Sequence, residues 1–368
     1  MSQYIQNIIK GVLMSTVVII AACKSNNDAR DIQKTPLDFA TIDTTTTTSC
    51  YITTWLSAKE KAMVFTWDDY KSGAGDVADL FNKYGLKTTF YISTDLLDNW
   101  KFNFRHPWVK TIFKKILADD HEIGTHSHTH VNLLSIPRNQ VEEQLSKSSD
   151  AFLKNFGFRP TSMSYPTSHY DKFTDSLVNK YYLDSRYSIQ KDSDSTFHWL
   201  HVRSSYNFSD VYKKEIDSFI YGNTITMIWG GHQLDNKNRG YEPMPENTLD
   251  SVLNYISTKY HDELWVTTYE DMILYSIMRQ EVKITNTKSE VLFNTENIDG
   301  ILEKYTHPHA FITLCFPNAI LDFSSEGLES AWYEKGNSYC TIDLRKTKHV
   351  RYSSLDSQYK PIGPKRNL

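Results

Sequence analysis

Residues 62–69 read Ala-Met-Val-Phe-Thr-Trp-Asp-Asp, a mainly apolar run that ends in two adjacent carboxylates. A short apolar run of this kind is typical of a strand buried in a parallel sheet. A second stretch, Gly-Thr-His-Ser-His-Thr-His at residues 124–130, contains a His-x-x-x-His pattern. Together the two stretches supply ligands for one divalent metal ion and leave one carboxylate free to act as a base.

Strand and helix signals alternate from about residue 60 to about residue 280. This alternation predicts a parallel sheet with crossover helices. Its length suits closure into a distorted (β/α) barrel, and the fold class is therefore α/β. The expected strands are 62–67, 88–92, 122–125, 162–165, 224–229 and 264–268, and the expected helices are 76–84, 107–117, 138–156, 173–182 and 246–260.

The residues suited to chemistry follow the expected strands. Asp68 and Asp69 follow the first strand, His126 and His130 the third, and His232 a late one. Because α/β barrels carry their active sites at the carboxyl ends of the strands, we expect these side chains to gather at one end of the barrel. Imidazole and carboxylate ligands suit zinc, and also some other divalent metals. A divalent metal, with zinc preferred, is the expected cofactor.

The helical rhythm fades after about residue 281, where strands are expected at 282–284, 291–293, 310–316 and 339–344. We expect a barrel domain over 56–280 and a small β-rich C-terminal domain over 281–368. Cys315 and Cys340 both lie in this C-terminal region, where they either form a disulfide or stay free and buried. The sequence contains no Cys-x-x-Cys pattern, which argues against a thiolate metal site.

The first 22 residues have the pattern of an export signal, with an apolar stretch from Gly11 to Ala22. The small residues before Cys23 resemble a bacterial lipobox, in which the signal is cut before the cysteine and the cysteine is lipidated. Residues 23–55 are polar and predict a tether. The expectation is an exported cell-envelope lipoprotein held at a membrane, in an unspecified leaflet. The alternative is an ordinary secretory signal with an incidental cysteine.

The composition narrows the class of partner. The formal net charge is −4 and no basic stripe stands out, so nucleic acid is not an expected partner. Aromatic residues make up 13% of the chain, which fits sugar-stacking surfaces and equally fits a well-filled core.

Four segments resemble motifs of the polysaccharide deacetylases with a NodB-homology domain, also called carbohydrate esterase family 4. Residues 66–69 resemble the Thr-Phe-Asp-Asp motif, with Trp67 in place of Phe, and residues 122–133 resemble the His-Ser/Thr-x-x-His motif. Residues 165–171 resemble the Pro-centred third motif, and residues 228–232 resemble the last, a His after an apolar strand. The resemblance covers about residues 60–280 and implies a barrel of the NodB-homology type.

The resemblance also implies roles for individual residues. Asp69, His126 and His130 would hold the metal, Asp68 would be the general base, and His232 the general acid. A backbone N–H near Thr167 would help to stabilise the oxyanion. Ser127 would brace the histidine loop, and His128 would lie outside the ligand set. Tyr165 and Trp229 neighbour the expected site, where each either contacts substrate or fills the barrel.

The sequence departs from the family pattern in two places. Many members carry an Arg shortly before the third-motif Pro to orient the base, but here Ser164 and Tyr165 precede Pro166. Arg159 and Arg203 are candidates for this role, and the assignment stays open. The family's Asp-and-Trp motif is not evident between Arg186 and Trp199.

The resemblance implies hydrolysis of acetyl groups on a glycan, with N-acetyl groups of amino sugars as the leading substrate. An O-acetyl ester on a polysaccharide such as xylan requires the same groups and is an alternative. A second alternative is a glycan-binding lipoprotein that no longer catalyses, which the absent third-motif Arg favours.

Overall fold

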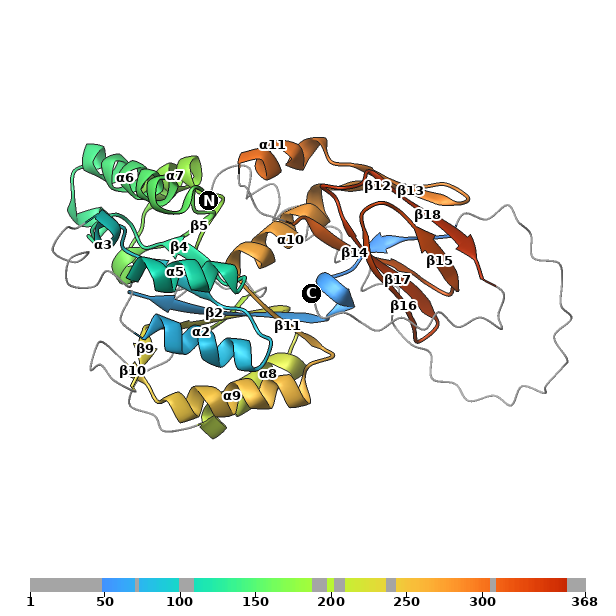
Figure 1. Ribbon diagram of the computed structural model, residues 1–368, viewed down its shortest axis with the longest axis horizontal. Coiled ribbons are helices and arrows are strands. Elements are labelled where there is room, and N and C mark those ends of the chain that lie inside the picture. The colour runs from blue at the N-terminus through green and yellow to red at the C-terminus, as the bar shows by residue number, and fades with distance from the viewer. Residues whose placement is uncertain are drawn as a thin grey trace, which may run out of the picture.

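The computed structural model describes residues 48–69, 73–98, 109–186, 197–201, 209–235, 243–304 and 309–355. They form an α/β part and a β-rich part that lie next to each other along the long axis of the molecule (Figure 1). The predicted export signal, Cys23 and the tether up to residue 47 lie outside the described residues. Within the described ranges, no helix has the length and apolar character needed to cross a bilayer.

A parallel sheet forms the centre of the α/β part, with strand order β6-β5-β4-β3-β2-β8-β7. The order confirms the predicted α/β class with crossover helices. The sheet curls into a half-barrel. This half-barrel is open, because the edge strands β6 and β7 are not paired with each other in the described part of the chain. The strands are β2 (Lys61–Asp68), β3 (Thr89–Ile92), β4 (Glu122–Thr125), β5 (Ser162–Ser164), β6 (Asp184–Arg186), β7 (Phe197–His201), β8 (Thr226–Gly231) and β11 (Leu264–Thr267).

Strand β2 is central to the sheet because it pairs with three other strands. One edge of β2 pairs with β8 along residues 62–67. On its other edge, residues 61–64 pair with β11 and residues 66–68 pair with β3. The two ends of β2 therefore have different neighbours, and its carboxyl end lies between β3 and β8.

Side chains of β2 alternate between two cores, as the period of a strand requires. Met63, Phe65 and Trp67 join the core beneath the outer helices, whereas Ala62 and Val64 join a second core that continues into the β-rich part. The described helices and turns of the α/β part are α2 (Ala74–Lys83), α3 (Asp95–Asp98), α5 (Val109–Ala118), η2 (Leu133–Ser135), α6 (Arg138–Phe156), η3 (Pro166–Ser168), α7 (Lys172–Tyr181), α8 (Ser209–Tyr221) and α9 (Glu246–Lys259), with the short strands β9 (Gln233–Leu234) and β10 (Pro243–Met244).

The β-rich part consists of two four-stranded antiparallel sheets, with orders β1-β14-β17-β16 and β12-β13-β18-β15. It confirms the expected β-rich C-terminal region. The elements are β12 (Lys283–Asn286), β13 (Glu290–Asn294), α11 (Glu296–Lys304), β14 (Phe311–Phe316), β15 (Leu321–Ser324), β16 (Leu328–Glu334), β17 (Asn337–Asp343) and β18 (His349–Ser354), together with β1 (Tyr51–Ile52) and η1 (Leu56–Ala58) from the other end of the chain.

Residues 51–58 attach to the β-rich part although they precede the α/β sheet in the chain. Strand β1 lies in the range expected as tether, and it pairs with β14. Helix α10 (Tyr269–Glu281) lies between the two parts (Figure 1). Its buried residues Met272, Tyr275 and Met278 share one core with Val64 of β2 and Leu314 of β14. The β-rich part therefore attaches at the amino end of β2, opposite the carboxyl end that carries Asp68.

The cysteines of the β-rich part are free. Cys315 and Cys340 are both fully buried, but Cys315 is paired in register with Tyr339, and Cys340 with Leu314. Since neighbouring residues of a strand point to opposite faces, this register directs the two thiols to opposite faces of the sheet, where they cannot form a disulfide.

Gly124 in β4 occupies a position with no room for a side chain. A Cβ atom there would lie 2.5 Å from Cε1 of Tyr91 and 2.7 Å from Oγ of Ser162. We expect Gly124→Ala to lower the free energy of unfolding by about 1–3 kcal/mol, because overpacking displaces these buried neighbours. Chemical denaturation measures this change.

Gly300→Ala is the matched control, since a Cβ at Gly300 in α11 would have nothing within 4 Å. It should leave the stability unchanged or raise it by up to about 1 kcal/mol, because alanine is the better helix former. Equal stability of the two variants would show that β3, β4 and β5 do not pack as described.

Candidate metal centre and base

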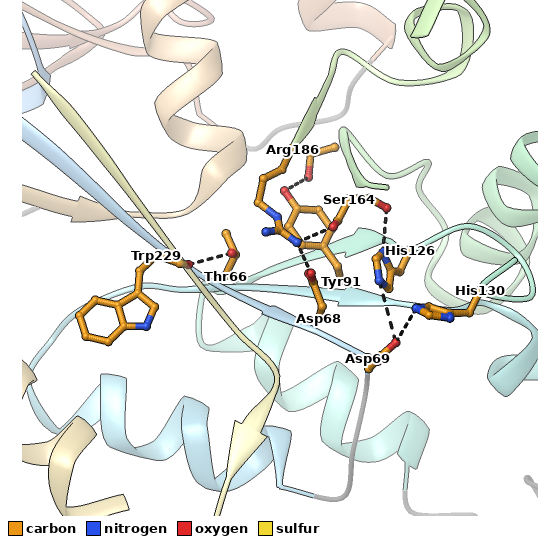
Figure 2. Close-up of polar contacts among 10 residues, drawn as sticks. Thr66, Asp68, Asp69, Tyr91, His126, His130, Ser164, Arg186 and Trp229 are labelled. Atoms are coloured by element: carbon orange, nitrogen blue, oxygen red, sulfur yellow. Dashed lines mark hydrogen bonds and ion pairs between the residues drawn. The ribbon is translucent and has the colours of Figure 1, made fainter. Parts of the chain in front are cut away.

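The two adjacent carboxylates at the end of β2 have different surroundings. Asp68 is the last residue of the strand and its side chain is 16% exposed, and Asp69 follows it with a left-handed backbone at φ 55°. This turn separates the two carboxylates, so that Asp68 contacts Arg186 and Asp69 faces the histidines of the next loop (Figure 2).

Asp69, His126 and His130 form a cluster able to hold a metal ion. Asp69 Oδ1 lies 3.1 Å from His130 Nε2 and 3.9 Å from His126 Nε2. One ligand atom from each residue lies within 4.8 Å of the others. Three protein ligands of this kind are the usual set for a catalytic zinc, because they leave a coordination position open.

The histidine loop presents its nitrogen atoms in the form that a metal needs. His126 is 3% exposed, and its Nδ1 lies 2.8 Å from the carbonyl oxygen of Ser164. Since a carbonyl only accepts, Nδ1 carries the proton and the lone pair of Nε2 faces Asp69. Burial lowers the pKa of His126, which favours the neutral ring. The residues present therefore fit a divalent metal.

The loop backbone is held in an unusual conformation. Ser127 and His130 have φ angles of 66° and 56°, a region that residues other than glycine seldom adopt. The backbone N–H of His130 donates to Ser127 Oγ at 3.1 Å, which closes the loop. His128 projects elsewhere, with its Nδ1 3.1 Å from Thr94 Oγ1, and lies outside the cluster.

Arg186 pairs with Asp68 and was missed by the sequence analysis. It is the last residue of β6 and is 4% exposed. Its guanidinium donates to the Asp68 carboxylate and to Ser164 Oγ, and lies 5.2 Å from the centre of the Tyr91 ring (Figure 2). The strand β6 was not expected from the sequence either, since three residues give too short a pattern for a prediction.

Arg186 keeps Asp68 ionised. Burial alone would raise the pKa of Asp68, but the charges of Arg186, His126 and His232 outweigh burial, and the net shift is downward. A general base must be ionised to accept a proton, and Asp68 is ionised beside the three side chains that could hold a metal ion. Of the two arginines considered earlier, Arg159 instead contacts Ser149 and Asp150 of α6, and Arg203 lies outside the described residues.

A second buried acid lies deeper in the barrel. Glu122 of β4 accepts hydrogen bonds from Thr89 Oγ1 at 2.9 Å and from the backbone N–H of Glu270 at 2.8 Å. Its other oxygen hydrogen-bonds Ser162 Oγ, which lies 3.1 Å from the Tyr91 hydroxyl. Burial, and then the charge of Glu270, raise the pKa of Glu122 to about 8. A protonated acid therefore supports the Tyr91 ring that Arg186 packs against.

His232 lines a small cavity together with Asp69, one of the three proposed metal ligands. It follows β8, and it lines the same cavity as Asp69 and the apolar side chains of Trp67, Val77 and Ile92. The structure thus brings Asp68, Asp69, His126, His130 and His232 to the carboxyl ends of β2, β4 and β8, as the sequence predicted.

Trp229 and Tyr165 do not point into this site. Trp229 is fully buried, with its ring 4.9 Å from Phe65 and 4.7 Å from Tyr212, and it lies away from the cluster (Figure 2). Tyr165 is 1% exposed, and its hydroxyl donates to Asp175 of α7. Its backbone N–H donates to the carbonyl of Arg186, so that it is not available to an oxyanion. Both rings therefore fill the hydrophobic core and do not line the site.

Thr167 is exposed on the turn after β5, with φ at 59°. Its hydroxyl hydrogen-bonds His169 Nδ1 at 3.1 Å. A role of its backbone N–H in binding an oxyanion stays a prediction.

Part of the chain is similar to known proteins. Residues 56–185 match the family model of the polysaccharide deacetylases. The chain is 28% identical over 93 residues to the uncharacterized protein YlxY of Bacillus subtilis, a match that covers 25% of this chain and 26% of that protein. It is 22% identical over 290 residues to a gellan lyase of a Bacillus species, covering 68% of this chain and 11% of that protein. The match therefore spans about a quarter and about a tenth of the lengths of these two relatives.

Solved structures similar to this chain include carbohydrate esterase domains. One is the Xyl-CE4 domain of a multidomain xylanase from the hindgut metagenome of Trinervitermes trinervoides, with a TM-score of 0.41 and 15% identity, covering 58% of this chain and 90% of that chain. Another is a peptidoglycan deacetylase from Bacillus subtilis, with a TM-score of 0.37 and 16% identity, covering 58% of this chain and 90% of that chain.

Removal of Arg186 should destabilise the protein through the charge that it leaves behind. We expect Arg186→Met to lower the free energy of unfolding at neutral pH by about 3–5 kcal/mol, because Asp68 stays buried without its partner. The pKa of Asp68 is lowered in the folded wild type, so the stability from the pair is lost as pH falls through that pKa. The gap between variant and wild type should therefore narrow at acid pH.

Denaturant unfolding of chelator-treated protein across a pH series measures this gap. Arg159→Met is the control, since its pair with Asp150 at 3.0 Å is exposed and should contribute less than about 1 kcal/mol. Arg186 would not be the partner of Asp68 if both variants lost the same small amount at every pH.

Glu122 should make stability fall as pH rises. Its pKa is about 8 in the folded protein against a reference of 4.5, so the folded state binds more protons between these values. A difference of one proton changes the free energy of unfolding by about 1.4 kcal/mol per pH unit, and here the sign is a loss with rising pH. Glu122→Gln removes the titration and should reduce this loss between about pH 5 and about pH 8.

Urea unfolding at about pH 5 and about pH 8 measures how much the free energy of unfolding falls over this range. Glu326→Gln, at an exposed turn of the β-rich part, is the control and should leave the slope of the wild type unchanged. A wild-type slope that persists in Glu122→Gln would mean that Glu122 is ionised in the folded protein.

Proposed function

We propose that the protein is a metal-dependent hydrolase that removes acetyl groups from a glycan, because residues 56–185 match the family model of the polysaccharide deacetylases. This match supports a hydrolase that acts on carbon–nitrogen bonds other than peptide bonds. One observation carries the proposal. The metal-ligand cluster of Asp69, His126 and His130 lies directly beside Asp68, a carboxylate that Arg186 holds in its ionised form.

The residues have separate tasks in this proposal. Asp69, His126 and His130 hold the divalent metal, with zinc preferred for its affinity for imidazole and carboxylate. Once bound, such a metal supplies Lewis-acid polarisation of the acyl oxygen and makes water a stronger acid. Asp68 takes the proton from the attacking water as general base. His232, which lines the same cavity as Asp69, gives a proton to the leaving amine or alcohol.

The composition of the cavity wall suits an acyl group. Its wall combines Asp69 and His232 with the apolar side chains of Trp67, Val77 and Ile92. Apolar side chains around a few polar groups are the usual composition of a ligand site. A methyl group can lie against the apolar wall while the carbonyl faces the metal cluster, which supports an acetyl group as the part removed.

N-acetyl groups of amino sugars are the leading substrate in the proposal. An O-acetyl ester on a polysaccharide such as xylan requires the same groups and is the alternative. A glycan-binding protein without turnover was favoured by the absence of an arginine in the third motif. Arg186 removes that reason, because it reaches the base from another strand.

Export and lipid anchoring at Cys23, and the domain limits at residues 56 and 280, stay predictions from the sequence.

Acetate release tests the proposal. We expect the chain from Lys24 onward, loaded with zinc, to release acetate from an acetylated amino-sugar oligomer or from acetylated xylan. Asp68→Asn should reduce the rate by about 10²–10⁴-fold, the usual contribution of a general base. His126→Ala should abolish both the activity and the rise in melting temperature that zinc gives to a protein that binds it.

His261→Ala is the control, since His261 is exposed beside Asp262 on the surface. It should keep the activity and the response to zinc. Zinc binding without acetate release from any substrate would contradict the roles of Asp68 and His232. Acetate release that persists in His126→Ala would contradict the metal site.

A further inference from the structure

Gln233 is a buried polar side chain whose amide has no hydrogen-bond partner among the described residues. Its side chain is 3% exposed. Within the part of the chain that the structure describes, neither Oε1 nor Nε2 of its amide has a hydrogen-bond partner. Buried amide groups in proteins nearly always have partners, because desolvation without one is unfavourable. Such a side chain indicates a binding site.

Gln233 is one of the residues that line the proposed catalytic cavity. The cavity is lined by Gln233 together with Asp69 and His232, the metal ligand and the proposed acid. Much of the remaining wall is apolar and includes Val77, Phe90 and Ile92, whose side chains have no hydrogen-bonding group, and Trp67, whose indole N–H already donates to Thr88 Oγ1 at 3.0 Å. A ligand in this cavity is therefore the group that can satisfy the amide.

The backbone holds Gln233 in place. β9 pairs with β10, with Gln233 opposite Pro243, and the N–H of Asp235 donates to the Met244 carbonyl at 2.8 Å. The next side chain, Leu234, is 2% exposed and belongs to the core beneath the outer helices. Since neighbouring strand residues point in opposite directions, burial of Leu234 fixes the opposite direction for Gln233.

We propose that Gln233 is the residue that selects N-acetyl over O-acetyl substrates, by accepting a hydrogen bond from the acetamido N–H on its Oε1. The proposal rests on the deacetylase function proposed above and names the substrate class of the same site. Nε2 then donates to a hydroxyl of the same sugar. An ester has no N–H, so Oε1 stays buried without a donor when an O-acetyl group binds. A site built around a substrate N–H rejects the analogue that lacks it for this reason.

Gln233→Met tests the proposal, because methionine has a similar length and shape but no amide. For a tetramer of β-1,4-linked N-acetylglucosamine, we expect kcat/KM for acetate release to fall about 10–100-fold, the usual loss with one substrate hydrogen bond. For O-acetylated xylotetraose, kcat/KM should change less than about threefold. The ratio of the two substrates is the measured quantity.

Two further measurements separate this role from a structural one and from catalysis. The melting temperature of Gln233→Met should equal or exceed that of the wild type, since removal of an unsatisfied buried amide relieves its desolvation. Calorimetric binding of the same two tetramers to metal-free protein should show about tenfold weaker binding of the N-acetyl tetramer only. Gln280→Met is the control, because Gln280 on α10 contacts Ser276 at an exposed position, and it should change none of these values.

The outcomes distinguish this proposal from the function on which it rests. An equal loss on both substrates, or no loss on either, overturns the selective role of Gln233. A clear drop in melting temperature also overturns it, because the amide would then have a structural partner. If the wild type releases no acetate, the proposed function fails, while N-acetyl binding that weakens only in Gln233→Met would still support Gln233 as the contact.

Discussion

The ion pair between Arg186 and Asp68 is the interaction on which the rest of the site depends. Both groups are taken largely out of water, at a cost that only close contact and further hydrogen bonds can offset. Arg186 meets this condition by donating also to Ser164 Oγ and by packing on the Tyr91 ring. The carbonyl of Ser164 orients His126. One network therefore fixes the charge of the proposed base and the direction of a metal ligand.

The sheet separates the site from the attachment of the β-rich part. β11 occupies the edge of β2 at residues 61–64, and helix α10 with the β-rich part completes the core at that amino end. The carboxyl end of β2, which carries Asp68 and is followed by Asp69, lies between β3 and β8. The β-rich part thus contributes to the stability of the barrel by packing at the end opposite Asp68.

Two kinds of buried polar group occur near the cavity, and they differ in whether other side chains satisfy their hydrogen bonds. Glu122 and Tyr91 belong to a network in which hydrogen bonds connect side chains on three neighbouring strands, so they rigidify the barrel. Gln233 is equally buried, yet the described residues leave its amide unsatisfied. The first arrangement stabilises the fold, whereas the second keeps a polar group ready for a ligand at some expense of stability.

The sequence by itself determined the features that depend on local pattern. Apolar runs and helical spacing predicted the α/β sheet, and the pairs Asp68–Asp69 and His126–His130 each lie within a few residues of one another. The same local reasoning could not find Arg186, which lies 118 residues from Asp68 in a strand of three residues. Nor could it place Trp229 and Tyr165, because a local pattern does not show whether an aromatic side chain near a site contacts the substrate or packs into the core. The tertiary structure decided these points, and with them the opposite faces of Cys315 and Cys340 and the buried amide of Gln233. The physical reason is that strand register and the packing of distant segments set which side chains meet, and neither is encoded within a short stretch of chain.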